Sequence, residues 1–513
     1  MSDRVEPKNL PRGEQRYSGK GLKADAVGFW DGVSIGLDST APAYSIAAVL
    51  GSIVIVAGVK APAVLLVSFI PMFFIAGAFY YMNRADQDAG TTFSWVTRAM
   101  GPWMGWMGGW AVFTTGVLVI GAQADVGARY TYLLLGLDDL AANKWAVVAL
   151  AVVMILVLTW ICVIGTELSA SVQRALVLAQ CGILLVFVLV AGWQMVRGDV
   201  AADAPSFGLD WLNPIGLSGS ALIAGMLLGV FCYWGWESAV NLTEETRDSE
   251  TAPGKAAVVS TILLLVIYIG SAIAIIGVLG LGVLEEFDDD EGLFLVVGDQ
   301  VLGGWSWLLV LAIITSTVAA TQTTILPASR TSLSMAVAGA FPKRFATVDP
   351  EHGTPGFGTW VIGIVAIVWY VLGSAISENF LFDSLSALSI VVAFYYALTG
   401  IACAIYWRRE LRRSVRAFIM IGLAPVIGAI VLLVLLVAAV IDYADPENSY
   451  TQTSILGMGA PLAMAIIIFV VGLVLMFISW RASGGGGYFE RTGGEEVSDD
   501  VARAALGPVA PGR

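Results

Sequence analysis

Apolar stretches long enough to cross a lipid bilayer follow one another along almost the whole chain. Because the hydrocarbon core of a bilayer takes about 20 apolar residues per helix, we expect twelve membrane helices. Of the 513 residues, 58% are hydrophobic and 13% are charged, against roughly 45–50% and about 25% in ordinary soluble domains. The sequence therefore predicts an all-α integral membrane protein. The expected helices are 27–57, 62–82, 105–133, 145–164, 171–196, 215–241, 257–283, 302–326, 357–374, 382–406, 417–441 and 454–479.

The basic residues predict how the chain is oriented. If the N-terminus lies in the cytoplasm, alternating the spans puts 23 of the 27 Lys and Arg residues on the cytoplasmic side, which is the bias that membrane proteins show. We therefore expect a multi-pass protein of the cell membrane with both termini in the cytoplasm. Residues 1–24 are polar and residues 481–513 are rich in glycine, so we expect two disordered cytoplasmic arms flanking a transmembrane domain at 25–480.

Composition also argues against several functions. A net charge of −13 does not suggest a nucleic-acid partner, because such proteins carry basic patches. The four cysteines lie in or at the ends of apolar stretches without paired spacing, so we expect neither disulfides nor a zinc site. The single histidine lies in an expected loop, whereas hydrolysis within a bilayer needs a constellation of catalytic side chains. We expect no metal, no cofactor and no enzymatic activity.

Two of the apolar stretches are interrupted near mid-membrane by small, polar and acidic residues. The interruptions are residues 36–42 (GLDSTAP) and residues 234–238 (WGWES). Such breaks survive in a membrane only where they line a cavity within the protein, and paired breaks in two halves of a chain indicate the binding site of a secondary transporter. With halves at about 25–197 and 213–407, five helices each, the sequence predicts a five-plus-five inverted repeat with broken helices 1 and 6. The last two helices, at about 415–480, are then accessory.

Three motifs resemble those of the amino acid–polyamine–organocation permease superfamily. Residues 89–95 (AGTTFSW) lead to residues 101–110 (GPWMGWMGGW), as in the signature between helices 2 and 3 of that family. Residues 231–237 (FCYWGWE) resemble its break in helix 6, and the loop 330–356, with its FPKRF run, resembles its loop after helix 8. The resemblance implies alternating access, and typically proton-coupled uptake or exchange of amino acids or amines.

The first break offers both backbone and side-chain ligands. Free N–H groups at the start of a half-helix suit a carboxylate. An acid at this depth costs roughly 2.5–3.5 kcal/mol on insertion scales and normally faces a cavity or a partner. Asp38 would therefore meet an ammonium group or carry the coupling proton, unless it forms a structural pair or the break is a simple kink at Pro42. The substrate-binding candidates here are Asp38, Ser39, Thr40 and Ala41.

The second break and the third helix supply the other candidates. Aromatic rings can enclose an ammonium by cation–π contact, worth about 0.5–2 kcal/mol, although aromatics at helical spacing also serve plain packing. Glu237 matches the acid of the family and is assigned to proton coupling or gating, with a gate hydrogen bond to the backbone as the alternative. The substrate-binding candidates are Phe231, Tyr233, Trp234, Gly235 and Trp236, together with Thr115 and Gln123, which fall on pocket positions of the family.

The candidate residues for a coupling-ion site lie in the expected helices 5 and 8. In some proton-coupled relatives a lysine in helix 5 replaces a sodium ion, and the corresponding position here is Gln180. Hydroxyls of Thr315 and Ser316 with carbonyls of the first break could coordinate sodium. Membrane hydroxyls also bond to the carbonyl one turn earlier. The positions at which the family carries the hydroxyls of the ion site correspond here to Ala319 and Ala320, which have none. We expect proton coupling, with sodium left open.

The sequence thus predicts a permease that carries an amino acid or related amine. A polyamine or monoamine carrier and an amino-acid exchanger are alternatives within transport. A non-transporting nutrient sensor is a more distant one.

Overall fold

The computed structural model describes residues 18–286, 293–377 and 379–506, and these are almost entirely helical. The α-helices are α1 (Phe29–Ser39), α2 (Pro42–Ala57), α3 (Ala61–Ala85), α4 (Thr92–Met100), α5 (Pro102–Leu134), α6 (Asp138–Ala141), α7 (Lys144–Ile164), α8 (Thr166–Arg197), α9 (Gly219–Cys232), α10 (Ser238–Asn241), α11 (Ala252–Leu279), α12 (Leu281–Glu286), α13 (Leu293–Leu302), α14 (Trp307–Val337), α15 (Gly356–Ile376), α16 (Phe380–Tyr406), α17 (Val415–Ala417), α18 (Ala424–Asp442), α19 (Ala460–Ala482) and α20 (Asp499–Leu506). The strands β1 (Ser454–Ile455) and β2 (Met458–Gly459) form an antiparallel hairpin before α19.

Short helical turns connect these helices. Those used below are η3 (Thr243–Glu245), η5 (Lys343–Ala346), η6 (Glu410–Arg412) and η9 (Gly487–Glu490), and the others are η1 (Gly58–Lys60), η2 (Leu209–Leu212), η4 (Gly303–Trp305), the π-helical η7 (Phe418–Leu423) and η8 (Pro446–Asn448).

Ten helical runs in the described part of the chain are long and apolar enough to cross a membrane. The first run contains α1, α2 and α3, and a shorter apolar helix, α9, leads into the second break. The predicted all-α membrane fold is therefore confirmed, while the number twelve and the inverted repeat stay predictions. The runs are Phe29–Ala85, Pro102–Leu134, Lys144–Ile164, Ser169–Arg197, Ala252–Leu279, Trp307–Val337, Gly356–Ile376, Phe380–Tyr406, Val415–Asp442 and Ala460–Ala482.

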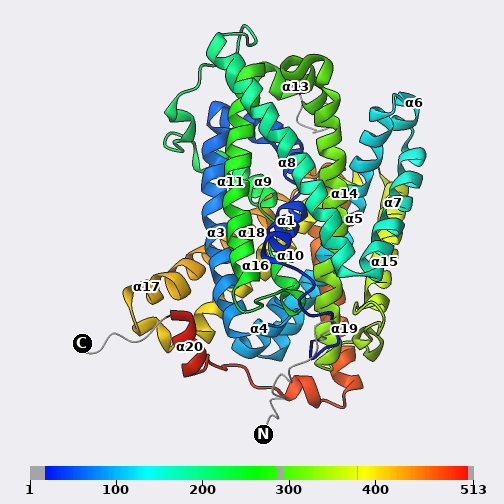
Figure 1. Ribbon diagram of the computed structural model, residues 1–513, viewed down its shortest axis with the longest axis vertical. Coiled ribbons are helices and arrows are strands. Elements are labelled where there is room, and N and C mark those ends of the chain that lie inside the picture. Colours follow the sequence, from blue (N-terminus) through cyan, green and yellow to red (C-terminus); the bar gives the residue numbers. More distant parts are fainter. Residues whose placement is uncertain (1–17, 287–292, 378, 507–513) are drawn as a thin grey trace.

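The most buried spans, α5 and α14, pack along each other through the body of the molecule. Helix α1 lies against α8, α11 and α14, and α2 lies against α9. Helices α4, α17 and α20 lie at one end of the bundle, and α6 and α13 lie at the other (Figure 1). This packing encloses both breaks within the protein, as opened backbone in a membrane requires.

Both predicted interruptions are breaks in helical structure. Helix α1 ends at Ser39 and α2 begins at Pro42, with Ala41 between them in the left-handed region at φ 48°. Helix α9 ends at Cys232 and α10 begins at Ser238. Pro42 suits the first turn of α2, where a missing N–H leaves no hydrogen bond unmade. The two breaks are therefore confirmed as features of the backbone.

The eighth expected span is displaced, and this corrects one detail of the sequence analysis. Helix α14 runs from Trp307 to Val337, whereas the hydropathy placed the span at 302–326 and put Arg330 in the following loop. Arg330 lies inside the helix with its side chain fully buried, paired with Glu245. A charge is tolerated inside the protein when an opposite charge and hydrogen bonds meet it, and hydropathy alone does not record that partner.

Parts of both expected arms pack on the helices. Tyr488 is buried, stacks on Phe93 and donates a hydrogen bond from its hydroxyl to the carbonyl of Pro102 at 2.8 Å. The chain then crosses the end of the bundle to reach α20 (Figure 1). The described parts of the arms, residues 18–24 and 481–506, therefore belong to the folded body, although we expected disorder there. Residues 1–17 and 507–513 lie outside the described part of the chain.

Candidate functional site

The two breaks meet at a small cavity. Its volume is about 10 Å³, which is close to the minimum for a single water molecule. An amino acid would therefore enter only after the lining elements move apart. The lining residues are Ser39 of α1, Val112, Thr115 and Gly116 of α5, Trp234, Gly235, Glu237 and Ser238 of the second break and α10, and Thr324 and Pro327 of α14.

The backbones of the two breaks touch in this cavity. The hydroxyls of Ser39 and Ser238 lie 2.7 Å apart and share a hydrogen bond. Gly235 has φ +122°, and a Cβ added there would lie 2.6 Å from the carbonyl oxygen of Ser39. Only glycine adopts that backbone region readily, and only glycine allows the close approach. The sequence identified both breaks, but their direct contact depends on the tertiary structure.

Glu237 is held by two tyrosines that the sequence analysis did not single out. The hydroxyls of Tyr395 and Tyr396, adjacent on α16, donate hydrogen bonds to the two carboxylate oxygens of Glu237. The N–H of Gly235 donates to the same carboxylate at 3.2 Å, and the indole of Trp234 donates to the Tyr395 hydroxyl at 2.5 Å. A buried Tyr hydroxyl usually finds a partner, so this pair of tyrosines within an apolar span was the available signal.

Asp38 does not line the cavity. It is fully buried and faces α8, where the side-chain amide of Gln180 donates to Asp38 Oδ1 at 2.5 Å. The other carboxyl oxygen of Asp38 and the amide oxygen of Gln180 have no hydrogen-bond partner among the described residues. Rotating the amide of Gln180 by 180° would present its oxygen to the carboxyl group instead. This pair can therefore accommodate either a carboxylate or a protonated Asp38.

The other candidates of the two breaks serve packing and capping. Thr40 donates its hydroxyl to the carbonyl of Leu37 at 2.6 Å at the end of α1, and Ala41 directly precedes α2 as its N-cap residue. The ring of Tyr233 packs on Phe69 and Tyr268, and Trp236 packs on Phe79 and Tyr396. Of the four aromatic candidates, Trp234 alone lines the cavity.

Phe231 and Gln123 lie away from the cavity. Phe231 lines a separate groove with aromatic residues of α2 and α16 and of the segment before β1. Gln123 is buried on α5, and its amide oxygen has no hydrogen-bond partner in the described residues. Among the candidates of α5, the structure places Thr115 in the cavity wall.

The three candidates for an ion site bond to three different sets of partners. The hydroxyl of Thr315 donates to the carbonyls of Leu311 and Ala312 in its own helix, which is the local bonding expected of membrane hydroxyls. The hydroxyl of Ser316 accepts the N–H of Tyr44 at 3.3 Å, while Gln180 binds Asp38. No cluster of three or more acidic, His or Cys side chains able to hold a metal ion occurs in residues 18–286, 293–377 and 379–506.

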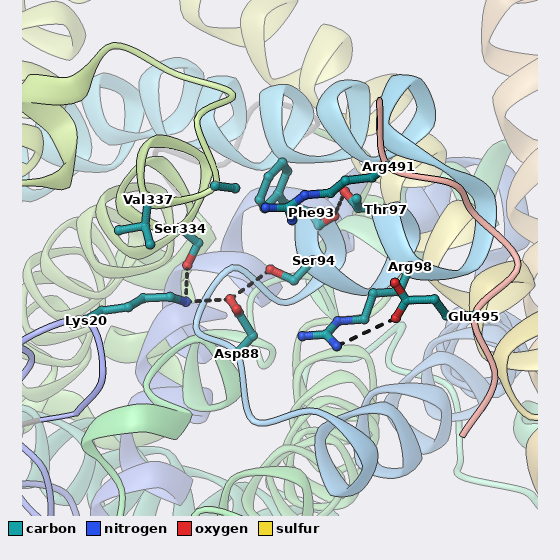
Figure 2. Close-up of a pocket in the computed structure, with 11 residues that line it drawn as sticks. Lys20, Asp88, Phe93, Ser94, Thr97, Arg98, Ser334, Val337, Arg491 and Glu495 are labelled. Atoms are coloured by element: carbon teal, nitrogen blue, oxygen red, sulfur yellow. Dashed lines mark hydrogen bonds and ion pairs between the residues drawn. The ribbon is translucent and has the colours of Figure 1, made fainter. Parts of the chain in front are cut away.

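A larger cavity opens at the end of the bundle that holds α4 (Figure 2). Its volume is about 440 Å³, and Lys20, Arg98 and Arg491 line it together with Asp88 and Glu495. The ammonium of Lys20 binds Asp88 at 2.7 Å, Glu244 of η3 at 2.7 Å and the hydroxyl of Ser334 of α14 at 2.8 Å. Lys20 therefore connects the N-terminal arm to the loop between α3 and α4, to η3 and to α14.

Charge decides the ionisation of the groups around Lys20. Burial opposes a charge on Asp88, but the ammonium of Lys20 together with hydrogen bonds from the Gly90 N–H and the Ser94 hydroxyl holds the pKa of Asp88 below its ordinary value. Burial likewise lowers the pKa of Lys20, and the carboxylates of Asp88 and Glu244 raise it above the ordinary value. Burial raises the pKa of the neighbouring Asp86 to about 6, against the opposing charge of Arg98. The Lys20 and Asp88 pair is thus charged near neutral pH.

Comparison with known proteins gives a family match over most of the chain. The model of the family described as "Amino acid permease" matches residues 36–471. The methylthioribose transporter of Bacillus subtilis (strain 168) is 26% identical over 292 residues, which are 54% of this chain and 60% of that protein. The b(0,+)-type amino acid transporter 1 of Mus musculus is 25% identical over 309 residues, 60% of each protein.

The match to a third relative covers a larger share of that protein. The branched-chain amino acid permease BcaP of Lactococcus lactis subsp. cremoris (strain MG1363) is 24% identical over 345 residues, which are 64% of this chain and 70% of that protein. Of the first two relatives, the chain spans 60% of the length.

Proposed function

The chain belongs to the amino acid permease family of the amino acid–polyamine–organocation superfamily, and we propose that it carries an amino acid or a related amine across the cell membrane by alternating access coupled to protons. The observation that carries this proposal is the cavity at which both helix breaks meet, walled by α5 and α14. Opened backbone at such a place offers N–H groups to a carboxylate and carbonyls to a cation. The relatives named as amino acid transporters support the substrate class.

The residues of the cavity have separate roles in this proposal. The N-terminal end of α2, next to Ser39, binds the substrate carboxylate, as positive helix ends suit an anion. The N–H groups of Thr40 and Ala41, which donate to the carbonyls of Leu37 and Asp38 in this structure, would exchange those partners for the carboxylate. Glu237, which lines the cavity, meets the ammonium group. Because three donors already bind this carboxylate, an ammonium would compete with the hydroxyls of Tyr395 and Tyr396. Substrate binding at the second break would in this way change the hydrogen bonds between Glu237 and the two tyrosines of α16.

Proton coupling is assigned to the pair of Asp38 and Gln180. The carboxyl group sits on α1 one residue before the cavity-lining Ser39, so its protonation acts on the segment that must move. A buried acid without a cationic partner favours its neutral form, and Gln180 can bind either form. In this proposal both termini lie in the cytoplasm. The contacts of Lys20 with Asp88 and Glu244 close the cytoplasmic face of the bundle between transport steps.

A ligand screen followed by uptake tests the proposed function. A compound that binds only the folded state raises the apparent melting temperature, by an amount that grows with its concentration above Kd. The purified protein is screened against amino acids, carboxylate-free amines and methylthioribose, and each hit is tested for uptake into proteoliposomes. Saturable uptake of an amino acid supports the proposal. Uptake of carboxylate-free amines alone would favour the polyamine or monoamine carrier, and binding without uptake would favour a sensor.

Uptake is expected to depend on an inward proton gradient and to need no sodium. The reason is that the described structure places Asp38 beside Gln180, whereas the hydroxyls of Thr315 and Ser316 are engaged in other bonds. The measurement is tracer uptake at clamped membrane potential, with sodium replaced by choline and with the pH gradient set or collapsed. A strict sodium requirement at fixed pH and potential would contradict the coupling claim and leave the cavity assignment standing.

Replacing Asp38 with Asn is expected to remove the pH dependence of uptake, with little change in substrate binding, because Asp38 does not line the cavity. The matched control is Asp125→Asn on α5, where Asp125 forms an ion pair with Arg129 at 3.6 Å and accepts a hydrogen bond from the hydroxyl of Tyr370 at 2.5 Å. We expect this control to keep its pH dependence. An Asp38→Asn variant whose uptake follows the wild-type pH profile would make Asp38 a structural residue.

A further inference from the structure

A groove on the membrane side of the bundle lies between α19, α5 and the segment that follows α14. We call it the α19 groove; it is lined by Trp106, by residues 339–343, by Leu475, Ile478, Ser479 and Ala482 of α19 and by Ser483, which follows α19. The α19 residues recur at the spacing of a single helix face. The groove has a volume of about 490 Å³, within the range of roughly 300–1,000 Å³ for small-ligand sites.

The walls of the groove are apolar and firmly built. Trp106 is fully buried, and the indole N–H of Trp106 and the hydroxyl of Ser479 both donate to the carbonyl oxygen of Ala340, at 3.0 and 2.9 Å. This one carbonyl therefore joins α5, α19 and the segment after α14. With its polar atoms satisfied in this way, the floor of the groove presents hydrocarbon and aromatic surface. Such a surface suits an apolar chain and no polar solute.

The groove lies where the membrane meets water. Helix α19 is a membrane span whose outer face exposes large apolar side chains, among them Ile478 at 54% and Phe477 at 50% exposure. At its end, Trp480 packs against Trp103 of α5 with ring centroids 6.1 Å apart, and Arg481 lies over Phe477 and Trp480. Tryptophans gather at the membrane–water interface, and basic side chains reach out from it. The groove therefore lies at the depth where acyl chains join their headgroups.

A positive charge stands at the mouth of the groove. Lys343, the first residue of η5, lines it and forms no ion pair with any carboxylate in the described residues. Arg344 follows directly and lies over the ring of Phe357. Basic groups beside membrane helices on the cytoplasmic side attract anionic lipid headgroups, by about 1 kcal/mol per Lys or Arg. An apolar groove with a lone ammonium at its water end matches one class of molecule in its charge and polarity.

We propose that the α19 groove binds an anionic glycerophospholipid of the cytoplasmic leaflet. One acyl chain lies along Leu475 and Ile478, and the phosphate meets the ammonium of Lys343. The bound lipid would brace the segment after α14 against α5 and α19, the three elements that the carbonyl of Ala340 joins. Helix α14 also lines the cavity between the breaks, so the lipid would stabilise one wall of that cavity.

The test is native mass spectrometry of the purified full-length protein, titrated with phosphatidylglycerol or phosphatidylcholine of identical acyl chains. We expect tighter binding of phosphatidylglycerol, weakened about fivefold in Lys343→Gln, which is the factor for one lost charge. Lys255→Gln, an exposed lysine near the start of α11, is the control of equal charge and should bind normally. Ala482→Trp fills the groove and should weaken binding of both lipids.

Two results would overturn this proposal. The first is equal affinity of the wild-type protein for the two lipids. The second is an equal loss of phosphatidylglycerol binding in Lys343→Gln and Lys255→Gln, which would mean a diffuse attraction to the basic face with no site at the groove. Lys343 is exposed, so its replacement tests the site even if Ala482→Trp does not fold.

Discussion

Replacing Gly235 with alanine is expected to abolish transport while the protein still inserts into the membrane. The added methyl carbon would lie 2.6 Å from the carbonyl oxygen of Ser39 and 2.8 Å from its carbonyl carbon. Backbone cannot yield as the end of a side chain can, so the two breaks must separate. The φ of +122° adds strain of about 1–3 kcal/mol for a residue with a Cβ. Gly235→Leu adds bulk to the same cavity and should be at least as severe.

Gly182→Ala is the matched control for this prediction. Gly182 lies within α8, and a Cβ added there would meet nothing within 4 Å. The measurements are expression, detergent-extracted yield and tracer uptake for Gly235→Ala, Gly235→Leu and Gly182→Ala. Loss of uptake in the first two with near-normal yield supports a functional contact between the breaks. Wild-type uptake by Gly235→Ala would remove that contact from the proposed mechanism.

Replacing Arg330 with methionine is expected to destabilise the protein by about 3–5 kcal/mol, because it leaves the carboxylate of Glu245 buried and uncompensated. Both side chains are fully buried. Arg330 binds the two oxygens of Glu245 at 3.0 Å each and the hydroxyl of Thr166 at 3.1 Å. The pair thereby joins α14 to η3, the turn after the second break, and to the start of α8. The measurement is the apparent melting temperature in detergent.

An exposed ion pair provides the control for Arg330→Met. Arg174 pairs with Asp31 at 3.0 Å, but its side chain is 52% exposed, and exposed pairs are worth about 0–1 kcal/mol. Arg174→Met should therefore change the melting temperature little. Replacing Glu245 with Leu in the Arg330→Met background should recover part of the loss, since no buried charge is then left unpaired. If Arg330→Met is no more harmful than Arg174→Met, the buried pair contributes little to the fold.

The membrane fold and the places where it is broken were readable from the sequence. Local composition indicates both features: apolar length sets which segments can enter lipid, and residues such as Gly235 and Pro42 favour a helix break when small and polar residues stand beside them. The end of α14 was not readable in this way. Arg330 and the hydroxyl residues beside it look like a loop, and they became helical interior because Glu245, 85 residues away, supplies the opposite charge.

The candidate site likewise has features that the sequence predicted and features that depend on tertiary packing. The sequence by itself determined an all-helical membrane chain, its two breaks, the acids beside them and the family, because each of these follows from a short run of residues. Only the tertiary structure decided that Gly235 touches Ser39, that Asp38 faces Gln180 and that Tyr395 and Tyr396 hold Glu237. These partners lie on helices distant in the chain. Which face a buried polar side chain turns to its neighbours depends on how whole helices pack, and a local pattern carries no record of that packing.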